Sequence, residues 1–181
     1  DLLRGVTLEQ ELAKSGPLPS DRVRKIMIQV CAAVKYAHQH AVVHRDLKPG
    51  NIMLLENEVD FVKVLDFGLA LIGESTRKIT QSGEFWGSPP YASPEQVKGE
   101  DTDHRSDIWS LGVILLEMLT HEKVFQGKSV TAVMFNIVHG ELPLLEKVEQ
   151  PLRRILAKAL EKDPDKRYQC VDDFLLALET I

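Results

Sequence analysis

The sequence predicts a mainly α-helical domain with a few short strands and one long irregular segment. Apolar residues recur at helical spacing over most of the chain, short β-type runs follow the first long helix, and residues 66–95 show neither period. With 181 residues, 44 % of them hydrophobic, the chain is long enough for one domain with a sizeable core.

The first long helix is predicted from Ser20, a residue type favoured at helix N-caps, to about His40. One face of it carries apolar residues at helical spacing: Val23, Ile26, Met27, Val30, Val34 and Ala37. Short strands are predicted next, because three short β-type runs are separated by turn residues. These runs are AVVH at 41–44, NIMLL at 51–55 and FVKVL at 61–65.

The second half of the chain is predicted to be helical. Residues 107–120 are apolar on nearly every face, which is typical of a helix at the centre of a bundle. Further helices are predicted at 129–138, at 152–160 before Asp163-Pro164, and at 171–178. The irregular segment 66–95 is rich in Gly, Ser, Thr and Pro, and loops of this length in compact domains are usually functional or disordered.

Composition excludes several classes of function. The net charge is −5 and basic residues alternate with acidic ones, so we expect no nucleic-acid partner. Cys31 and Cys170 lie far apart without CxxC spacing, which favours two core thiols in a reducing, cytoplasmic compartment over a disulfide or zinc site. The longest apolar run, 108–119, is short for a bilayer and contains Glu117, so we predict no membrane segment in this chain.

Two motifs supply the groups that phosphoryl transfer requires. The loop VVHRDLKPGNIMLL, residues 42–55, contains the pattern H-R-D-x-K-x-x-N, with Asp46, Lys48 and Asn51 at its chemical positions. A second carboxylate, Asp66, follows a predicted strand in VLDFGLA, and the irregular segment closes with Ser93-Pro94-Glu95. Positioned carboxylates, a metal-binding amide and a cation are the parts that this chemistry needs.

Together these motifs resemble the C-terminal lobe of a protein kinase, most closely the eukaryotic-like serine/threonine kinases of bacteria. DIWSLGVILLEMLT at 107–120 is similar to the family's central helix, and KDPDKRY at 162–168 to its late arginine-bearing turn. A single tripeptide is a weak signal, whereas this ordered set at family spacing is specific and covers nearly the whole chain. The resemblance implies a helical lobe with 42–55 as catalytic loop and 66–95 as activation segment.

The resemblance also implies catalytic roles. Asp46 would orient the substrate hydroxyl and accept its proton, and Lys48 would neutralise the γ-phosphate of ATP. Asn51 and Asp66 would hold Mg²⁺, which prefers hard oxygen ligands. Lysine at position 48 is the serine/threonine-kinase form of the loop, so Ser and Thr hydroxyls of proteins are the expected acceptors.

Nucleotide contacts and regulatory sites follow from the same resemblance. Met53 would lie against the adenine ring, while Leu3 and the backbone of Asp1 match the hinge, of which residues 1–4 would be the remnant. Thr80 and Ser82 match the hydroxyl pair that bacterial kinases autophosphorylate. A phosphate there would pair with Arg45, the arginine before the catalytic aspartate.

Other residues are expected to be structural. Glu95 and Arg167 match the family's buried ion pair, and Asp107 matches the carboxylate that holds the catalytic-loop backbone. His38 and His40, near the end of a predicted helix, are expected to be solvated residues rather than metal ligands. Trp109 is expected in the core.

The family's Gly-rich loop, strand lysine and helix glutamate do not occur in the sequence before Asp46. We therefore expect the C-terminal lobe alone, without the N-terminal β-lobe, and weak or no catalysis by this chain in isolation. An apolar surface that includes Met53 and Phe67 would then be exposed and favour self-association. The alternatives are a pseudokinase scaffold that binds partners without catalysis and, less favoured because of the Ser93-Pro94-Glu95 motif and the later helices, a small-molecule phosphotransferase.

Overall fold

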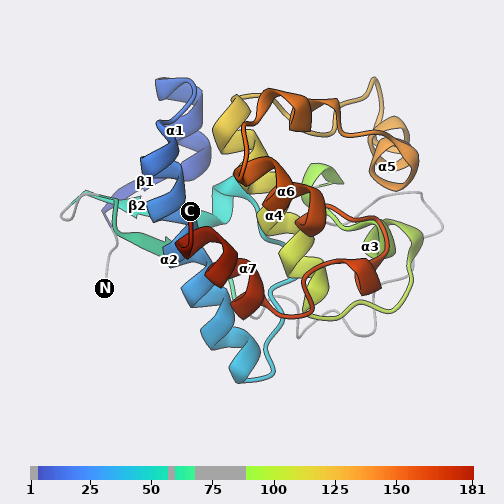
Figure 1. The fold of residues 1–181 in the computed structure, drawn as a ribbon, viewed down its shortest axis with the longest axis horizontal. Helices are drawn as coiled ribbons and strands as arrows, with labels where there is room; N and C mark the ends of the chain where they lie inside the picture. The colour runs from blue at the N-terminus through green and yellow to red at the C-terminus, as the bar shows by residue number, and fades with distance from the viewer. Residues whose placement is uncertain (1–3, 57–59, 68–88) are drawn as a thin grey trace.

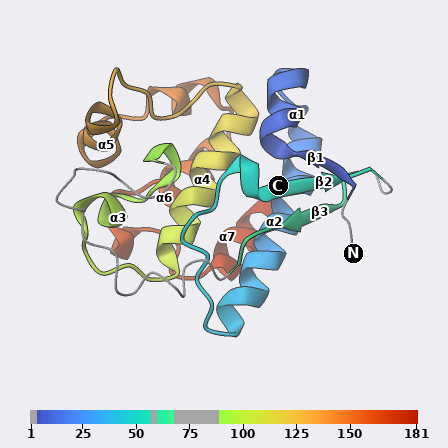
Figure 2. The same ribbon diagram turned by 180° about the vertical axis from the view of Figure 1, so that it is seen from behind.

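The structure, a computed structural model, describes residues 4–56, 60–67 and 89–181. Its centre is α4, Arg105–Thr120, which lies between the other helices in both ribbon views (Figures 1 and 2). All its residues from Ser106 to Met118 are buried, and it contacts α2, α6 and α7. A helix that is apolar on all faces must be covered on every side. The burial of α4 therefore confirms the predicted central helix and the mainly α-helical fold class. The helix begins two residues earlier than the sequence predicts.

Helix α2, Ser20–Gln39, packs along α7, Val171–Glu179. Every apolar residue of the predicted stripe is buried, which confirms the face that this helix turns to the core. The first helical residue is Ser20, and Pro19 takes the N-cap position, so the predicted cap is shifted by one residue.

A three-stranded antiparallel sheet lies beside α1 and α2 (Figure 2). Its strands are β1 (Gly5–Thr7), β2 (Ile52–Leu55) and β3 (Val62–Val64), with β2 in the middle. Position 5 needs glycine because a Cβ there would lie 2.1 Å from the carbonyl oxygen of Leu54 across the β1–β2 pair. The predicted strands at 51–55 and 61–65 are thus confirmed in their central residues.

One local prediction is wrong, and one helix was missed. The run AVVH at 41–44 forms no strand, and the short helix α1, Leu8–Ser15, was not predicted. Helix α1 begins at a capping box in which Thr7 accepts from the backbone of Gln10, and the Gln10 side chain accepts from the backbone of Thr7.

The remaining helices surround the far side of α4. They are α3 (Pro94–Lys98), α5 (Val130–His139) with Ser129 as N-cap, and α6 (Leu152–Ala159). Short 3₁₀ turns occur at Pro89–Tyr91, Pro143–Lys147 and Pro164–Lys166. The predicted helices at 129–138, 152–160 and 171–178 are confirmed, whereas α3 lies partly inside the segment predicted to be irregular.

Core predictions are confirmed for Trp109, which is fully buried and stacks on Phe125 with ring centroids 5.7 Å apart. Cys31 is also buried, but Cys170 is only half-buried, so it is not the core residue expected. Both thiols are free. Among the described residues, no helix is both long and apolar enough to cross a bilayer.

Candidate active site

The backbone of the loop at 42–55, named the HRD loop after His44-Arg45-Asp46, is held by a carboxylate from the central helix. Asp107, fully buried in the first turn of α4, accepts the amide protons of His44 at 2.9 Å and of Arg45 at 2.7 Å. Arg45 has φ +66°, a left-handed conformation that costs a residue with a Cβ roughly 1–2 kcal/mol. The two hydrogen bonds offset this cost and fix the turn that presents Asp46, as predicted for Asp107.

His38 is the third donor to the same carboxylate. Its Nε2 lies 2.8 Å from Asp107 Oδ2, and the side chain is only 11 % exposed. The expectation of a solvated histidine is therefore wrong for His38. His38 lies in the last turn of α2, and the packing of α2 against α4 brings its side chain to Asp107, 69 residues away in sequence.

His44 connects the HRD loop to the segment that carries Asp66. Its Nδ1 accepts the amide proton of Asp46 at 3.3 Å, so Nε2 carries the ring proton and donates to the carbonyl of Leu65 at 2.9 Å. His44 as a whole is 2 % exposed, and its ring contacts the ring of Phe67 edge to face, with centroids 4.8 Å apart. The side chain of His44 thus connects the HRD loop to the segment that contains Leu65 and Phe67.

Asp46, Lys48 and Asn51 lie together. The ammonium of Lys48 is 2.7 Å from Asp46 Oδ2, and the amide nitrogen of Asn51 donates to the carbonyl oxygen of Asp46 at 3.0 Å. The Asp46 side chain is 43 % exposed and that of Lys48 28 %, whereas Asn51 is buried. This arrangement offers a carboxylate and a cation to a ligand from solvent while a buried amide holds the loop below them.

The hairpin formed by β2 and β3 brings Asp66 next to Asn51. Ile52 pairs with Val64, and the amide of Leu65 donates to the carbonyl of Asn51 at 2.8 Å. The backbone of Asp66, the next residue, therefore starts next to Asn51. Because the Asn51 amide nitrogen is committed to Asp46, its amide oxygen is the atom left for a cation. One carboxylate and one amide oxygen suit Mg²⁺, which keeps several waters and uses few protein ligands.

The other predicted nucleotide contact among the described residues is Met53. It lies in the middle of the sheet, half-buried, between Thr7 of β1 and Lys63 of β3. Asp1, Leu3, Thr80 and Ser82 lie outside the described residues.

Gln96 is a site residue that the sequence reasoning missed. Its side chain donates to the carbonyl of Arg45 at 2.9 Å and thereby ties α3 to the HRD loop. It is also the N3 residue of a capping box with Ser93, whose amide donates to the Gln96 side chain at 2.9 Å. The signal was the pattern S-x-x-Q at 93–96, which marks a helix start.

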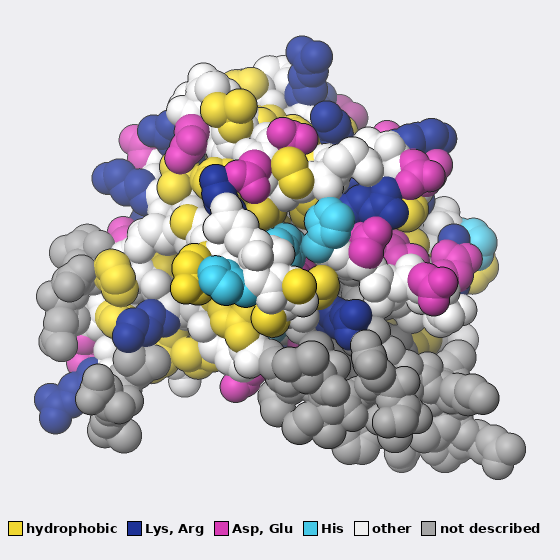
Figure 3. All heavy atoms as spheres, turned by 90° about the horizontal axis from the view of Figure 1, so that it is seen from below, with side chains coloured by type: hydrophobic (Ala, Val, Ile, Leu, Met, Phe, Trp, Pro, Cys, Tyr) yellow, Lys and Arg dark blue, Asp and Glu magenta, His cyan; other side chains and the backbone are white. Residues whose placement is uncertain are grey.

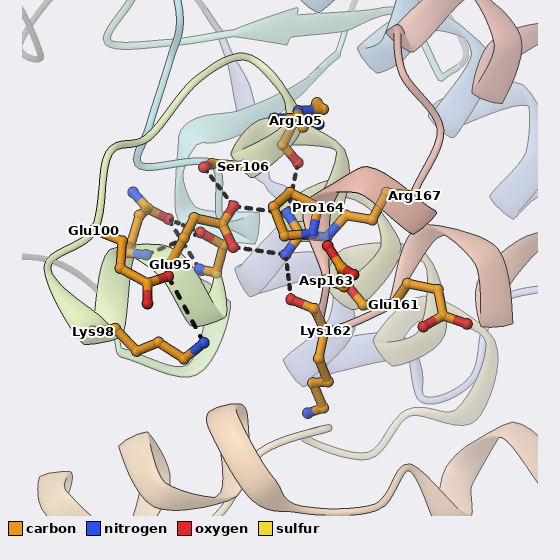
Figure 4. Close-up of polar contacts among 12 residues, drawn as sticks. Glu95, Lys98, Glu100, Arg105, Ser106, Glu161, Lys162, Asp163, Pro164 and Arg167 are labelled. Atoms are coloured by element: carbon orange, nitrogen blue, oxygen red, sulfur yellow. Dashed lines mark hydrogen bonds and ion pairs between the residues drawn. The ribbon is translucent and has the colours of Figure 1, made fainter.

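The predicted pair of Glu95 and Arg167 is confirmed as a buried bidentate ion pair (Figure 4). Two guanidinium nitrogens lie 2.7 and 2.6 Å from the two carboxylate oxygens, and Ser106 donates to Glu95 Oε1 at 2.7 Å. Burial alone would raise the pKa of Glu95, but hydrogen bonding to Arg167 and its charge outweigh burial, so the pKa lies below its ordinary value. The pair anchors α3 to the turn before α7, 72 residues away.

Comparison with known proteins agrees with this geometry. The profile of the protein kinase domain family matches residues 1–174. The chain is 41 % identical over 170 residues to the serine/threonine-protein kinase PknB of Mycolicibacterium smegmatis, an alignment that covers 91 % of this chain and 27 % of that protein. It is 40 % identical over 181 residues to a probable serine/threonine-protein kinase of Streptomyces coelicolor, covering 97 % of this chain and 26 % of the relative.

A third relative is the serine/threonine-protein kinase PrkC of Bacillus subtilis, 35 % identical over 184 residues, covering 99 % of this chain and 28 % of the relative. The chain therefore spans about a quarter of the length of the curated relatives it matches. The chain belongs to the protein kinase domain family, and within it to the bacterial-type serine/threonine kinases.

Proposed function

We propose that this chain forms the catalytic-loop side of the active site of a protein that transfers phosphate from MgATP to Ser or Thr hydroxyls of other proteins. The observation that carries the proposal is the cluster of Asp46, Lys48 and Asn51 beside the start of the segment with Asp66. Family membership supports it, because protein kinases in general use ATP, Mg²⁺ and protein substrates.

In the proposed reaction, Asp46 orients the attacking hydroxyl and accepts its proton. Lys48, already within 2.7 Å of that carboxylate, places positive charge beside the transferred phosphoryl group. Asn51 and Asp66 would hold Mg²⁺, which when bound neutralises phosphate charge. The buried bonds from Asp107 keep Asp46 in position throughout, so little reorganisation is needed during the reaction.

Nucleotide binding and regulation are further parts of the proposal. Met53, Leu3 and the backbone of Asp1 would contact the adenine. Phosphates on Thr80 and Ser82 would pair with the guanidinium of Arg45, whose Nε is buried and has no hydrogen-bond partner among the described residues. We also propose a cytoplasmic site of action, consistent with the two free thiols.

Residues 1–181 alone are proposed to bind ATP weakly and to self-associate. Weak binding follows because the family's Gly-rich loop and strand lysine, which contact the phosphates, do not occur among them. Self-association follows from apolar side chains at the sheet side of the lobe, where Phe61 is 40 % and Phe67 37 % exposed.

The decisive experiment compares Asp46→Asn with Asp101→Asn in the protein that contains this chain. Phosphate transfer from MgATP to a generic Ser/Thr protein substrate is expected to fall by roughly 10²–10⁴-fold in Asp46→Asn, since the proton acceptor is lost. Asp101 is exposed on the loop before α4 and should tolerate the change. Retained transfer in Asp46→Asn would refute the mechanism, and an inactive parent protein would favour the scaffold function.

A further inference from the structure

The peptide unit between Arg45 and Asp46 is held at both of its polar groups by side chains. The carbonyl of Arg45 accepts a hydrogen bond from Gln96 Nε2 at 2.9 Å, and the amide of Asp46 donates to His44 Nδ1 at 3.3 Å. Because a peptide unit is planar and turns as one body, these two bonds together fix its orientation. The direction in which the Asp46 side chain leaves the backbone depends on that orientation.

The bonds from Asp107 do not reach this peptide unit. Its carboxylate holds the amides of His44 and Arg45, which precede the unit that carries Asp46. Arg45 already has a left-handed φ of +66°, and the next backbone torsion is restrained by the partner of its carbonyl. That partner, Gln96, belongs to α3 and lies 51 residues away in sequence. The restraint thus comes from an element outside both the HRD loop and the central helix.

The side-chain amide of Gln96 has two tasks that need opposite groups. Its Oε1 accepts the amide proton of Ser93 at 2.9 Å and completes the capping box of α3, while its Nε2 donates to Arg45. One backbone partner is a donor and the other an acceptor, which determines which way the amide points. A capping box needs only the acceptor and is served equally by glutamate. The start of α3 therefore does not require glutamine at position 96, whereas the bond to the HRD loop requires its donor.

We propose that Gln96 is a positioning residue for Asp46, because it holds the preceding peptide unit so that the carboxylate is directed at the attacking hydroxyl. The inference rests on the proposed function, in which Asp46 accepts the proton of that hydroxyl. A displacement of a catalytic group by about 1 Å can lower the rate by about 10²-fold. The residues that Gln96 bonds, Ser93 and Arg45, are not among those proposed to contact the nucleotide. Loss of its donor is therefore expected to lower kcat and to leave the KM for MgATP nearly unchanged.

Two variants separate the loop bond from the helix cap in the protein that contains this chain. Gln96→Glu keeps an acceptor for the Ser93 amide but offers no donor to Arg45. Its kcat for phosphate transfer to a generic Ser/Thr protein substrate should fall by roughly 10–10²-fold, with the KM for MgATP within about twofold. Ser93→Ala removes the hydroxyl that accepts the Gln96 amide proton at 3.3 Å and leaves the bond to Arg45 intact. It should lower the urea midpoint and keep kcat within about twofold.

An unchanged kcat in Gln96→Glu, or an equal loss of kcat in Ser93→Ala, would overturn the proposal. So would a loss in Gln96→Glu that falls on the KM for MgATP while kcat stays native. In each case the bond between Gln96 and Arg45 would have no specific effect on the reaction of Asp46.

The charge that Gln96→Glu adds must be separated from the loss of the donor. Gln96→Met has neither a donor nor a charge, and it should lower kcat to a similar degree. Lys98→Met changes the net charge by the same one unit on the same helix, at a side chain that is 44 % exposed, and should keep the native kcat. Acidic and basic side chains already lie beside one another over the face seen from below (Figure 3), so one exposed charge more or less is a small change. A native kcat in Gln96→Met would overturn the proposal.

The orientation of the peptide unit has its own measurement, which needs no phosphate transfer. Hydrogen exchange of the Asp46 amide should be severalfold faster in Gln96→Glu and Gln96→Met than in the native protein, and unchanged in Lys98→Met. Circular dichroism checks that each variant is folded. Unchanged exchange in both Gln96 variants would overturn the proposal even in an active kinase. If the native protein transfers no phosphate, the proposed function fails, and exchange of the Asp46 amide alone decides whether Gln96 orients this peptide unit.

Discussion

Asp107 shows how much of the HRD loop depends on one buried carboxylate. Replacing it by alanine leaves the buried amides of His44 and Arg45 without acceptors, together with the imidazole of His38. We expect Asp107→Ala to lower the free energy of unfolding by roughly 2–6 kcal/mol, at ~1–3 kcal/mol for each of the two amides. Urea denaturation would measure this. The exposed change Asp101→Ala, in the loop before α4, should stay within about 0.5 kcal/mol of the native protein. A similar loss of stability in both variants would contradict the role of Asp107.

Arg167 gives a prediction that depends on pH. Arg167→Met leaves Glu95 buried without a counter-charge, and the expected loss of stability at neutral pH is roughly 3–5 kcal/mol. The native pKa of Glu95 is below its ordinary 4.5, so the native stabilisation is complete above 4.5 and is lost as pH falls through the folded-state pKa.

In Arg167→Met, burial instead raises the pKa of Glu95, and protonation relieves the stranded charge. The stability difference between the two proteins should therefore begin to narrow above pH 4.5, as Glu95 of the variant becomes protonated, and narrow further below 4.5 as the native ion pair is lost, measured by urea denaturation at several pH values. Lys166→Met, at a side chain that is 68 % exposed, is the matched control. A difference that is constant with pH would exclude Glu95 as its source.

At the residue scale, the sequence predicted the partners that a motif defines and missed those that only the fold defines. Glu95, Arg167 and Asp107 have fixed places in a family pattern. His38 was assigned to solvent because it lies near the end of a predicted helix, but its acceptor comes from another helix, 69 residues away. Gln96 was overlooked because its bond to the Arg45 carbonyl exists only once α3 packs against the loop.

The end of helix α5 is capped by a lysine from another segment. Lys162 donates to the carbonyl of Ile137 at 2.6 Å and lies 5.0 Å from the ring centroids of Trp109 and Phe125. Burial, with the nearby charge of Arg167, lowers the pKa of Lys162 from 10.5 to about 8.

Between about pH 8 and 10.5 the native Lys162 loses its proton while the unfolded chain keeps it. The unfolded state then binds more protons, so this lysine makes stability rise with pH across that window. Relative to Lys162→Met, the native protein should become more stable from pH 7.5 to pH 9.5 in urea denaturation. If the stability difference between the native protein and Lys162→Met does not change with pH, then Lys162 titrates in the folded protein as it does in the unfolded chain.

Helices α4 and α6 approach closely at Gly112. A Cβ there would lie 3.0 Å from Leu160 Cδ2 and 3.1 Å from Ala159 Cβ. Gly112→Leu should therefore cost about 1–3 kcal/mol through overpacking, despite the better helix propensity of leucine. Thermal denaturation would measure the loss. Adding Leu160→Ala should recover part of it, and failure to recover any would place the strain elsewhere.

At the element scale, helices with three or more buried apolar residues at helical spacing were predictable whatever their length. Helices α2, α4, α6 and α7 each bury such a pattern, whereas α1 buries only Leu8 and Leu12, and α3 has five residues. The run at 41–44 has β-type residues, but the amide of His44 donates to Asp107 instead of to a neighbouring strand. The carboxylate of Asp107 thus takes the place of the strand-to-strand hydrogen bonds that the β propensity of these residues favours.

At the scale of the whole molecule, the apolar residues at the sheet side make association testable. We expect the 181-residue chain to form dimers as its concentration rises, measured by sedimentation velocity. Phe61→Ser combined with Phe67→Ser should shift the equilibrium toward monomer, because both rings are more than one-third exposed. Phe135→Ser, which removes a 62 % exposed ring on α5, is the control. A monomer at all concentrations would contradict the proposal.

The position of Asp107 in α4 also has a consequence for the order of folding. The bonds that shape the HRD loop span 62 and 63 residues, and the pair that anchors α3 spans 72. Contacts of such separation form late, because loop closure must precede them. A refolding chain can therefore acquire its helices while the loop before Asp46 still lacks its shape, and that loop is completed only after the central helix is in place.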